Sequence, residues 1–344
     1  MKENRVYSLD ILRIIAATMI VLHHYQQVTN SYFGGKFNFR GYSVVVEFFF
    51  FLSGYLAWRY TKTKQVGFIP FIKKKALRLL PLVAISSVVY EILLLIYINV
   101  CEKEWFFGND ISIWGVVLNS VGLQCGWFFE NPSVNNPTWY VSVLLLCYVI
   151  YWLLDALSRK CKVPLACFWV AMVMIGVVIR FFDWNLPFLN AYAARGYYSF
   201  FWGLLMAGLV NRKKLDMKWT LSIITILLGL YFGVDWLVLL YKGIHNYVLV
   251  FICYPLLVSL FLSEPVKKLL DFRMLGILGE ATYDIYVWHI PLMLAMYIVL
   301  EEFQISLNLD YYKCLIAFVV GAYLVGIVSY LVINRPMQRL VNRL

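Results

Sequence analysis

Ten apolar stretches, each long enough to approach a membrane crossing, constrain the fold of this chain more than any other feature. About 20 mostly apolar residues in a helix cross roughly 30 Å of hydrocarbon. The alternating ten-residue strands of an outer-membrane barrel are absent from the sequence. We therefore predict an all-α polytopic membrane protein with ten transmembrane helices. They fall at approximately residues 9–28, 42–60, 79–99, 138–157, 164–182, 196–211, 219–240, 246–263, 275–299 and 314–334.

Composition excludes an ordinary soluble enzyme. Of the 344 residues, 62% are hydrophobic and 14% are charged, where a soluble domain has roughly 25% charged residues. Nothing is left over for a soluble domain, so we expect one membrane domain over residues 1–344. The first helix contains Arg13 and no small-residue cleavage site, so we expect it to remain in the mature protein. The cysteines and histidines show no metal-ligand spacing, and we expect no metal.

Positive charge predicts the topology. The net charge of +11 reflects loop placement in so apolar a chain, and we expect no nucleic-acid partner. With ten crossings, 22 of the 30 Lys and Arg residues lie on one side and seven, among them Arg195, lie on the other. Cytoplasmic loops carry the excess of Lys and Arg, so both termini are predicted to be cytoplasmic. An extra apolar stretch at 111–129 is interrupted by Gly and amide residues, and we interpret it as interfacial or re-entrant.

Ionisable residues inside the predicted helices are the first candidates for a site, because burying each in lipid is costly. Arg13 and His24 lie eleven residues apart on the first helix, which separates them by about 16 Å. Glu47 lies early in the second helix, at a depth similar to that of His24, so the two side chains can meet. The full set is Arg13, His23, His24, Glu47, Glu91, Asp284 and His289.

A carboxylate beside an imidazole is typical of general-base catalysis on a hydroxyl. Two other interpretations stay open for a His24–Glu47 pair: a contact that only joins two helices, and a proton relay in a transporter. His23 points about 100° away from His24 around the helix, so we expect it to form a hydrogen bond with a neighbouring helix instead.

The longest predicted outer loop, 101–137, combines aromatic residues with acids. Such a surface suits sugar rings, but membrane proteins have an aromatic belt at the membrane interface regardless of substrate, and we favour that interpretation. The residues are Trp105, Phe106, Phe107, Trp114, Trp127, Phe128 and Phe129, with Glu102, Glu104, Asp110 and Glu130.

Five motifs, in order along the chain, resemble those of acyltransferase family 3, bacterial membrane enzymes that acylate cell-envelope and exported carbohydrates. They are Arg13 with His24; Glu47 followed by Phe50, Phe51, Ser53 and Gly54; Lys75, Arg78 and Pro81; Trp139, Tyr140 and Ser142; and Gly279, Tyr283, Tyr286, His289 and Pro291. The ending Asn334, Arg335 and Pro336 departs from the family's usual Glu-Lys/Arg-Pro.

The resemblance implies a multi-pass enzyme of the bacterial cytoplasmic membrane. Its donor would be cytoplasmic acyl-CoA, with acetyl the default and succinyl a rival, and its acceptor a hydroxyl of a surface or lipid-linked carbohydrate. Arg13, Lys75 and Arg78 would hold the donor phosphates. His24, oriented by Glu47, would act as the general base, and a covalent acyl intermediate is a variant of the mechanism.

The remaining motif residues are assigned to the substrate cavity or to helix packing. Ser53 and Trp139 are assigned to the substrate cavity, with Ser53 beside Gly54 interpreted as a close helix contact rather than a nucleophile. Tyr283 and His289 either line the cavity and polarise the thioester, or pack between helices. The sequence leaves open a homodimer and the roles of Glu91 and Asp284. A secondary transporter or glycan exporter is the alternative function, since it would also use buried charges, although we find no inverted repeat.

Overall fold

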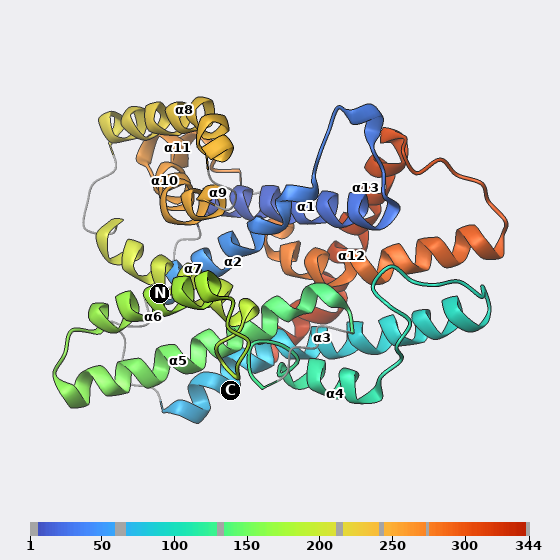
Figure 1. Cartoon of the computed structure of the whole chain (residues 1–344), viewed down its shortest axis with the longest axis horizontal. Helices are drawn as coiled ribbons and strands as arrows, with labels where there is room; N and C mark the ends of the chain where they lie inside the picture. Colours follow the sequence, from blue (N-terminus) through green and yellow to red (C-terminus); the bar gives the residue numbers. More distant parts are fainter. Residues whose placement is uncertain are drawn as a thin grey trace.

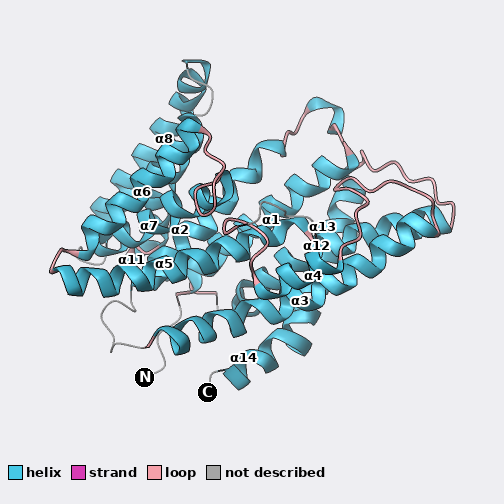
Figure 2. Ribbon diagram, turned by 60° about the horizontal axis from the view of Figure 1, so that its bottom comes forward, coloured by secondary structure: helices cyan, strands magenta, loops and turns pink. Residues whose placement is uncertain are grey.

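The computed structural model describes residues 6–58, 67–128, 134–210, 216–240, 244–272 and 275–341, with the backbone alone at 231–240 and 244–245. Apart from one isolated bridge between Leu186 and Leu189, these residues contain helices, turns and loops (Figure 1, Figure 2). The all-α prediction is confirmed.

Each predicted apolar stretch overlaps a helix. The α-helices are α1 Tyr7–Thr29, α2 Val45–Ala57, α3 Phe68–Asn99, α4 Ile113–Val121, α5 Trp139–Cys161, α6 Leu165–Phe182, α7 Ala191–Val210, α8 Met217–Leu240, α9 Ile244–Val248, α10 Tyr254–Phe261, α11 Glu264–Leu269, α12 Gly276–Glu302, α13 Tyr312–Ser329 and α14 Arg335–Val341. Two π-helical segments, Leu249–Cys253 and Tyr330–Asn334, connect α9 to α10 and α13 to α14.

Among the described residues, six helices are long and apolar enough to cross a membrane. They begin at Tyr7, Phe68, Asn136, Leu165, Gly276 and Tyr312. The other predicted crossings fall on α2, on α7, on α8 and on the helices from α9 to α10. The count of ten and the cytoplasmic location of the termini stay predictions, and parts of the charged loops, such as 59–66 and 211–215, lie outside the described residues.

Two helices begin earlier than the apolar pattern predicts. Helix α3 starts at Phe68 instead of 79, and α7 starts at Ala191 instead of 196. Lys and Arg are good helix formers, so a basic segment continues the helix beyond its apolar part. As a result Lys75 and Arg78 lie inside α3, and Arg195, which the topology count assigns to an outer loop, lies inside α7.

The stretch 111–129 contains a single short helix. Helix α4 has nine residues, too few at 1.5 Å per residue to cross a bilayer. The Ser112 side chain accepts a hydrogen bond from the Gly115 amide at its start, and Gly122, with a positive φ of 72°, ends it. An interfacial or re-entrant segment fits this geometry.

Helices α2 and α7 pack with their backbones in contact. A Cβ added at Gly54 would overlap the carbonyl oxygen of Phe200, and one added at Gly203 would overlap that of Phe51. Small residues let membrane helices approach in this way. The interpretation of Ser53 and Gly54 as part of a close helix contact therefore holds for Gly54.

Pro291 changes the bonding of α12. Proline has no N–H, so the carbonyl of Val287, four residues earlier, loses its helical partner. The side-chain amide of Asn135 donates to that carbonyl at 3.0 Å. Figure 1 shows α12 crossing near α1 at the centre of the bundle, so this bond ties the loop before α5 to a central helix.

Candidate active site

One cavity of about 610 Å³ gathers most of the residues that the sequence assigns to a donor site. We call it the basic cavity. Its lining comprises Val6, Leu9, Asp10, Arg13, Phe49, Ser53, Leu56, Ala57, Lys75, Arg78, Leu79, Tyr140, Leu144, Tyr148, Gly279, Glu280, Thr282, Tyr283, Tyr286 and Gln338. Two lining residues, Arg78 and Glu280, are exposed and mark the mouth of the cavity. Val6 and Gln338, near the two ends of the described chain, also line it.

The predicted phosphate-binding residues line this cavity from two helices. Arg13 of α1 forms an ion pair with Asp10 at 2.8 Å, and Gly279 leaves the room that Asp10 occupies. Lys75 of α3 places its ammonium group 4.2 Å from the centre of the Tyr148 ring. Arg78 lies one turn further along α3. Three cations from two helices can bind an anionic ligand together.

His24 pairs with His289 at the centre of the bundle. His24 Nδ1 and His289 Nε2 are 2.9 Å apart, so one imidazole donates a hydrogen bond to the other. His24 retains 9% of its surface accessible and His289 retains none. Of the two residues, only His24 retains accessible surface.

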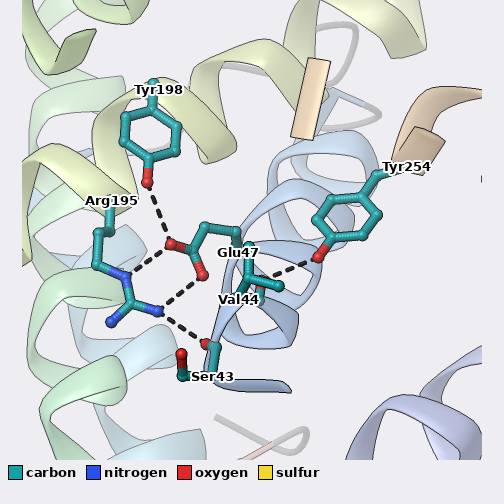
Figure 3. Close-up of polar contacts among 6 residues, drawn as sticks. All are labelled: Ser43, Val44, Glu47, Arg195, Tyr198 and Tyr254. Carbon is teal, nitrogen blue, oxygen red and sulfur yellow. Dashed lines mark hydrogen bonds and ion pairs between the residues drawn. The ribbon is translucent and has the colours of Figure 1, made fainter. Parts of the chain in front are cut away.

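The expected pair between His24 and Glu47 is wrong. Glu47 accepts two hydrogen bonds from Arg195 of α7, at 2.7 and 2.8 Å, and one from the Tyr198 hydroxyl at 3.1 Å (Figure 3). Arg195 also donates to the carbonyl of Ser43. The Glu47 side chain therefore bonds to α7 and not to His24.

The other predicted cavity residues divide into two groups. Ser53 lines the basic cavity, with its hydroxyl 3.3 Å from that of Tyr140. Tyr283 also lines it and donates to the carbonyl of Leu79 at 2.7 Å, so its hydroxyl is engaged between helices. Trp139, by contrast, does not line the basic cavity: its ring packs under the guanidinium of Arg195 at 4.7 Å.

Three other buried ionisable residues do not line the basic cavity. His23 Nδ1 lies 3.2 Å from the carbonyl of Phe39, which belongs to the loop before α2 and not to a neighbouring helix as expected. Asp284 accepts hydrogen bonds from Ser329 at 2.7 Å and from Asn334 at 2.6 Å. Asn334, from the ending that departs from the family pattern, thus binds α12. Both oxygens of Glu91 are buried without a hydrogen-bond partner among the described residues.

The aromatic residues of the loop 101–137 do not form one surface. Trp105 is buried between Tyr97 and Tyr297, whereas Phe106, Trp114 and Phe128 are exposed. The ring of Phe107 lies 6.3 Å from that of His24, so this loop reaches the histidine pair. Phe129 and Glu130 lie outside the described residues.

Sequence reasoning missed several residues around the site. Arg195 and Tyr198, the partners of Glu47, were hidden because Arg195 was counted as a loop charge. The signal that could have found the pair is an arginine at the edge of one apolar stretch together with a lone glutamate in another. Asp10 and Phe49, both in the lining of the basic cavity, carried no signal of their own.

Comparisons with known proteins identify the family of the chain. The family model described as an acyltransferase domain matches residues 6–335. An O-acetyl transferase of Shigella phage Sf6 is 26% identical over 209 residues, which are 58% of this chain and 61% of the phage protein. The chain thus aligns with less than two thirds of that relative. No solved structure matches. The family match covers nearly the whole chain and includes all five motifs, and the protein belongs to acyltransferase family 3.

Proposed function

We propose that this protein is a multi-pass enzyme of the bacterial cytoplasmic membrane that transfers an acyl group from cytoplasmic acyl-CoA to a carbohydrate hydroxyl on the far side. Acetyl is the default group, as the name of the phage relative supports, and succinyl is the rival. The single observation that carries the proposal is that the basic cavity joins Arg13, Lys75 and Arg78 to a lining residue, Tyr286, whose ring lies 6.0 Å from that of His289.

The charges of the cavity suit the donor. The nucleotide end of acyl-CoA carries several phosphate groups, which Arg and Lys side chains bind through charge-assisted hydrogen bonds. Arg13, Lys75 and Arg78 lie on the face predicted to be cytoplasmic. The extended pantetheine arm would then run past Ser53 toward the histidine pair.

The chemical step uses His24 as a general base. His24 Nε2 can accept a proton when the hydrogen of the neutral ring is on Nδ1. The 2.9 Å contact permits this, because Nδ1–H can donate a hydrogen bond to His289 Nε2. The acceptor hydroxyl loses its proton to His24 as its oxygen forms a bond with the thioester carbonyl carbon. The carbon–sulfur bond then breaks, and the proton passes from His24 to the departing thiolate of CoA. His289 takes the positioning role that the sequence assigns to Glu47.

Membranes of the host cell allow a direct test, because they retain the native acceptor. Inside-out vesicles with and without the gene receive radiolabelled acetyl-CoA, and esters released from the carbohydrate fraction by mild alkali are counted. We expect labelled ester only when the gene is present. Equal labelling of the two kinds of vesicle would contradict an acyltransferase. If the vesicles instead export acylated glycan whether or not acyl-CoA is added, the result would favour an exporter.

A further inference from the structure

Three aromatic rings close the end of the basic cavity that is farthest from its charged mouth. On α2, α5 and α12, the lining residues deepest in the bundle are Phe49, Tyr140 and Tyr286 respectively. Each of these helices contributes other lining residues closer to the mouth, such as Ala57 on α2 and Gly279 on α12. The three deepest residues therefore share one level of the bundle.

The rings contact one another in a closed triangle. The ring centres are 6.2 Å apart for Phe49 and Tyr140, 6.3 Å for Phe49 and Tyr286, and 5.7 Å for Tyr140 and Tyr286. These are separations of rings in direct edge or tilted contact. Since each ring comes from a different helix, the triangle spans the gap that the helices enclose.

The histidine pair lies directly beyond this triangle. Tyr286 lines the basic cavity, and its ring centre is 6.0 Å from that of His289. One turn of α12, about 4.5 Å of rise, separates the two residues. His24 and His289 are not themselves among the lining residues. An acyl group that enters with its CoA from the charged mouth must therefore pass the three rings to reach His24.

Two of the three rings carry a hydroxyl that forms a hydrogen bond, and the third ring has no polar atom. Tyr286 donates its hydroxyl hydrogen bond to the carbonyl of Pro137, and the Tyr140 hydroxyl bonds Ser53 at 3.3 Å. Phe49 has no polar atom with which to anchor its ring and is only partly buried. Its ring is the one that can rotate aside at the lowest cost.

From this geometry we infer that Phe49, Tyr140 and Tyr286 form a size filter for the acyl group, with Phe49 as the residue that sets the longest chain accepted. The inference rests on the proposed acyl-CoA function and adds the determinant of its donor specificity. A small group such as acetyl passes with a small displacement of the Phe49 ring. Longer chains require space that a well-packed set of rings does not provide.

Donor length measured in host vesicles tests the filter. Inside-out vesicles containing the parent protein, Phe49→Ala or Phe49→Leu receive radiolabelled acetyl-, propionyl- or butyryl-CoA, and alkali-labile acyl groups on the carbohydrate fraction are counted. One methylene in an apolar pocket changes the specificity by roughly 10- to 200-fold, so we expect Phe49→Ala to raise the ratio of butyryl to acetyl transfer at least about tenfold. Phe49→Leu should raise it less.

Phe48→Leu is the matched control. Phe48 is an equally large, buried ring on the same helix that packs against Tyr254 and does not line the basic cavity. It should leave the ratio at the parent value. An active parent with an unchanged ratio in both Phe49 variants would overturn the filter alone, as would an equal rise in Phe48→Leu. A parent that transfers no acyl group from any of the three donors would instead contradict the proposed function.

Discussion

His24 Nδ1 and His289 Nε2 lie 2.9 Å apart, so the two imidazoles share one hydrogen-bonding proton across the interface of α1 and α12. Two neutral rings satisfy this contact with one donor and one acceptor, whereas two protonated rings would place like charges against each other. The arrangement fixes which nitrogen of His24 is available, and it connects the roles of the two residues.

His24→Ala should abolish acyl transfer while the protein still binds acyl-CoA. General-base assistance contributes typically 10²–10⁴-fold to the rate, so a count of labelled ester in vesicles detects its loss. His23→Ala is the control, since His23 bonds the carbonyl of Phe39 and should cost much less. A folded His24→Ala protein that transfers at the parent rate would remove the base assigned here.

Substitutions at His289 separate positioning from packing. In His289→Gln the side-chain oxygen can still accept the hydrogen bond from His24 Nδ1, whereas in His289→Leu nothing can. We expect the Gln variant to retain more turnover than the Leu variant, with similar apparent KM for acyl-CoA. Equal turnover in the two variants, at equal thermal stability, would show that His289 only packs.

Substitution of Glu47 or Arg195 should mainly lower the thermal stability of the protein. Breaking a buried ion pair from one side leaves a charge without its partner and costs up to about 3–5 kcal/mol. Glu47→Gln and Arg195→Gln should each lower the Tm of the purified protein, and the double variant should lose less than the two single losses combined. Normal Tm in Glu47→Gln together with a selective fall in turnover would instead support the role first expected from the sequence.

Arg13→Ala and Arg78→Ala should weaken acyl-CoA binding. Hydrogen bonds to charged groups contribute about 1.5–3 kcal/mol each, so each loss should raise Kd by about tenfold or more. Arg159→Ala is a control of equal charge change, because Arg159 is an exposed residue paired with Asp155 outside the basic cavity. If all three variants bind acyl-CoA alike, the donor site lies elsewhere.

The predicted topology is open to reporter fusions. Reporters placed after Leu344 and within residues 62–66, before α3, should be cytoplasmic, and one near Asn109 should be outside, because 22 of 30 basic residues fall on the predicted inner side. Accessibility of substituted cysteines at the same positions provides an independent measurement. A cytoplasmic signal near Asn109 would contradict the ten-crossing arrangement.

Depth along a helix could be predicted from the sequence, but direction around it could not. The apolar stretches place Arg13 at the cavity and His24 deeper in the bundle, and the basic residues Lys75 and Arg78 join Arg13 as expected. The direction of the Glu47 side chain could not be predicted in the same way. Its partner depends on which helix packs against α2, and that helix is α7, whose contact is made through Gly54 and Gly203.

The aromatic triangle shows the same limit. Phe49 stands in a run of four phenylalanines, so nothing in the sequence distinguishes the one ring that lines the basic cavity. Tyr140 and Tyr286 are 146 residues apart in the sequence, and only the tertiary fold brings their rings within 5.7 Å of each other. Long-range neighbours of this kind follow from the tertiary fold and not from local periodicity.

The segment that precedes α5 is bonded to α12, although the two regions are far apart in the sequence. Asn135 binds the carbonyl released by Pro291, and the carbonyl of Pro137 receives the hydroxyl of Tyr286. A redesign that exchanges this loop between relatives to obtain a new carbohydrate acceptor would therefore also move Tyr286. Acceptor and donor preference in this scaffold would then change together, and engineering one without the other requires keeping residues 135–137 intact.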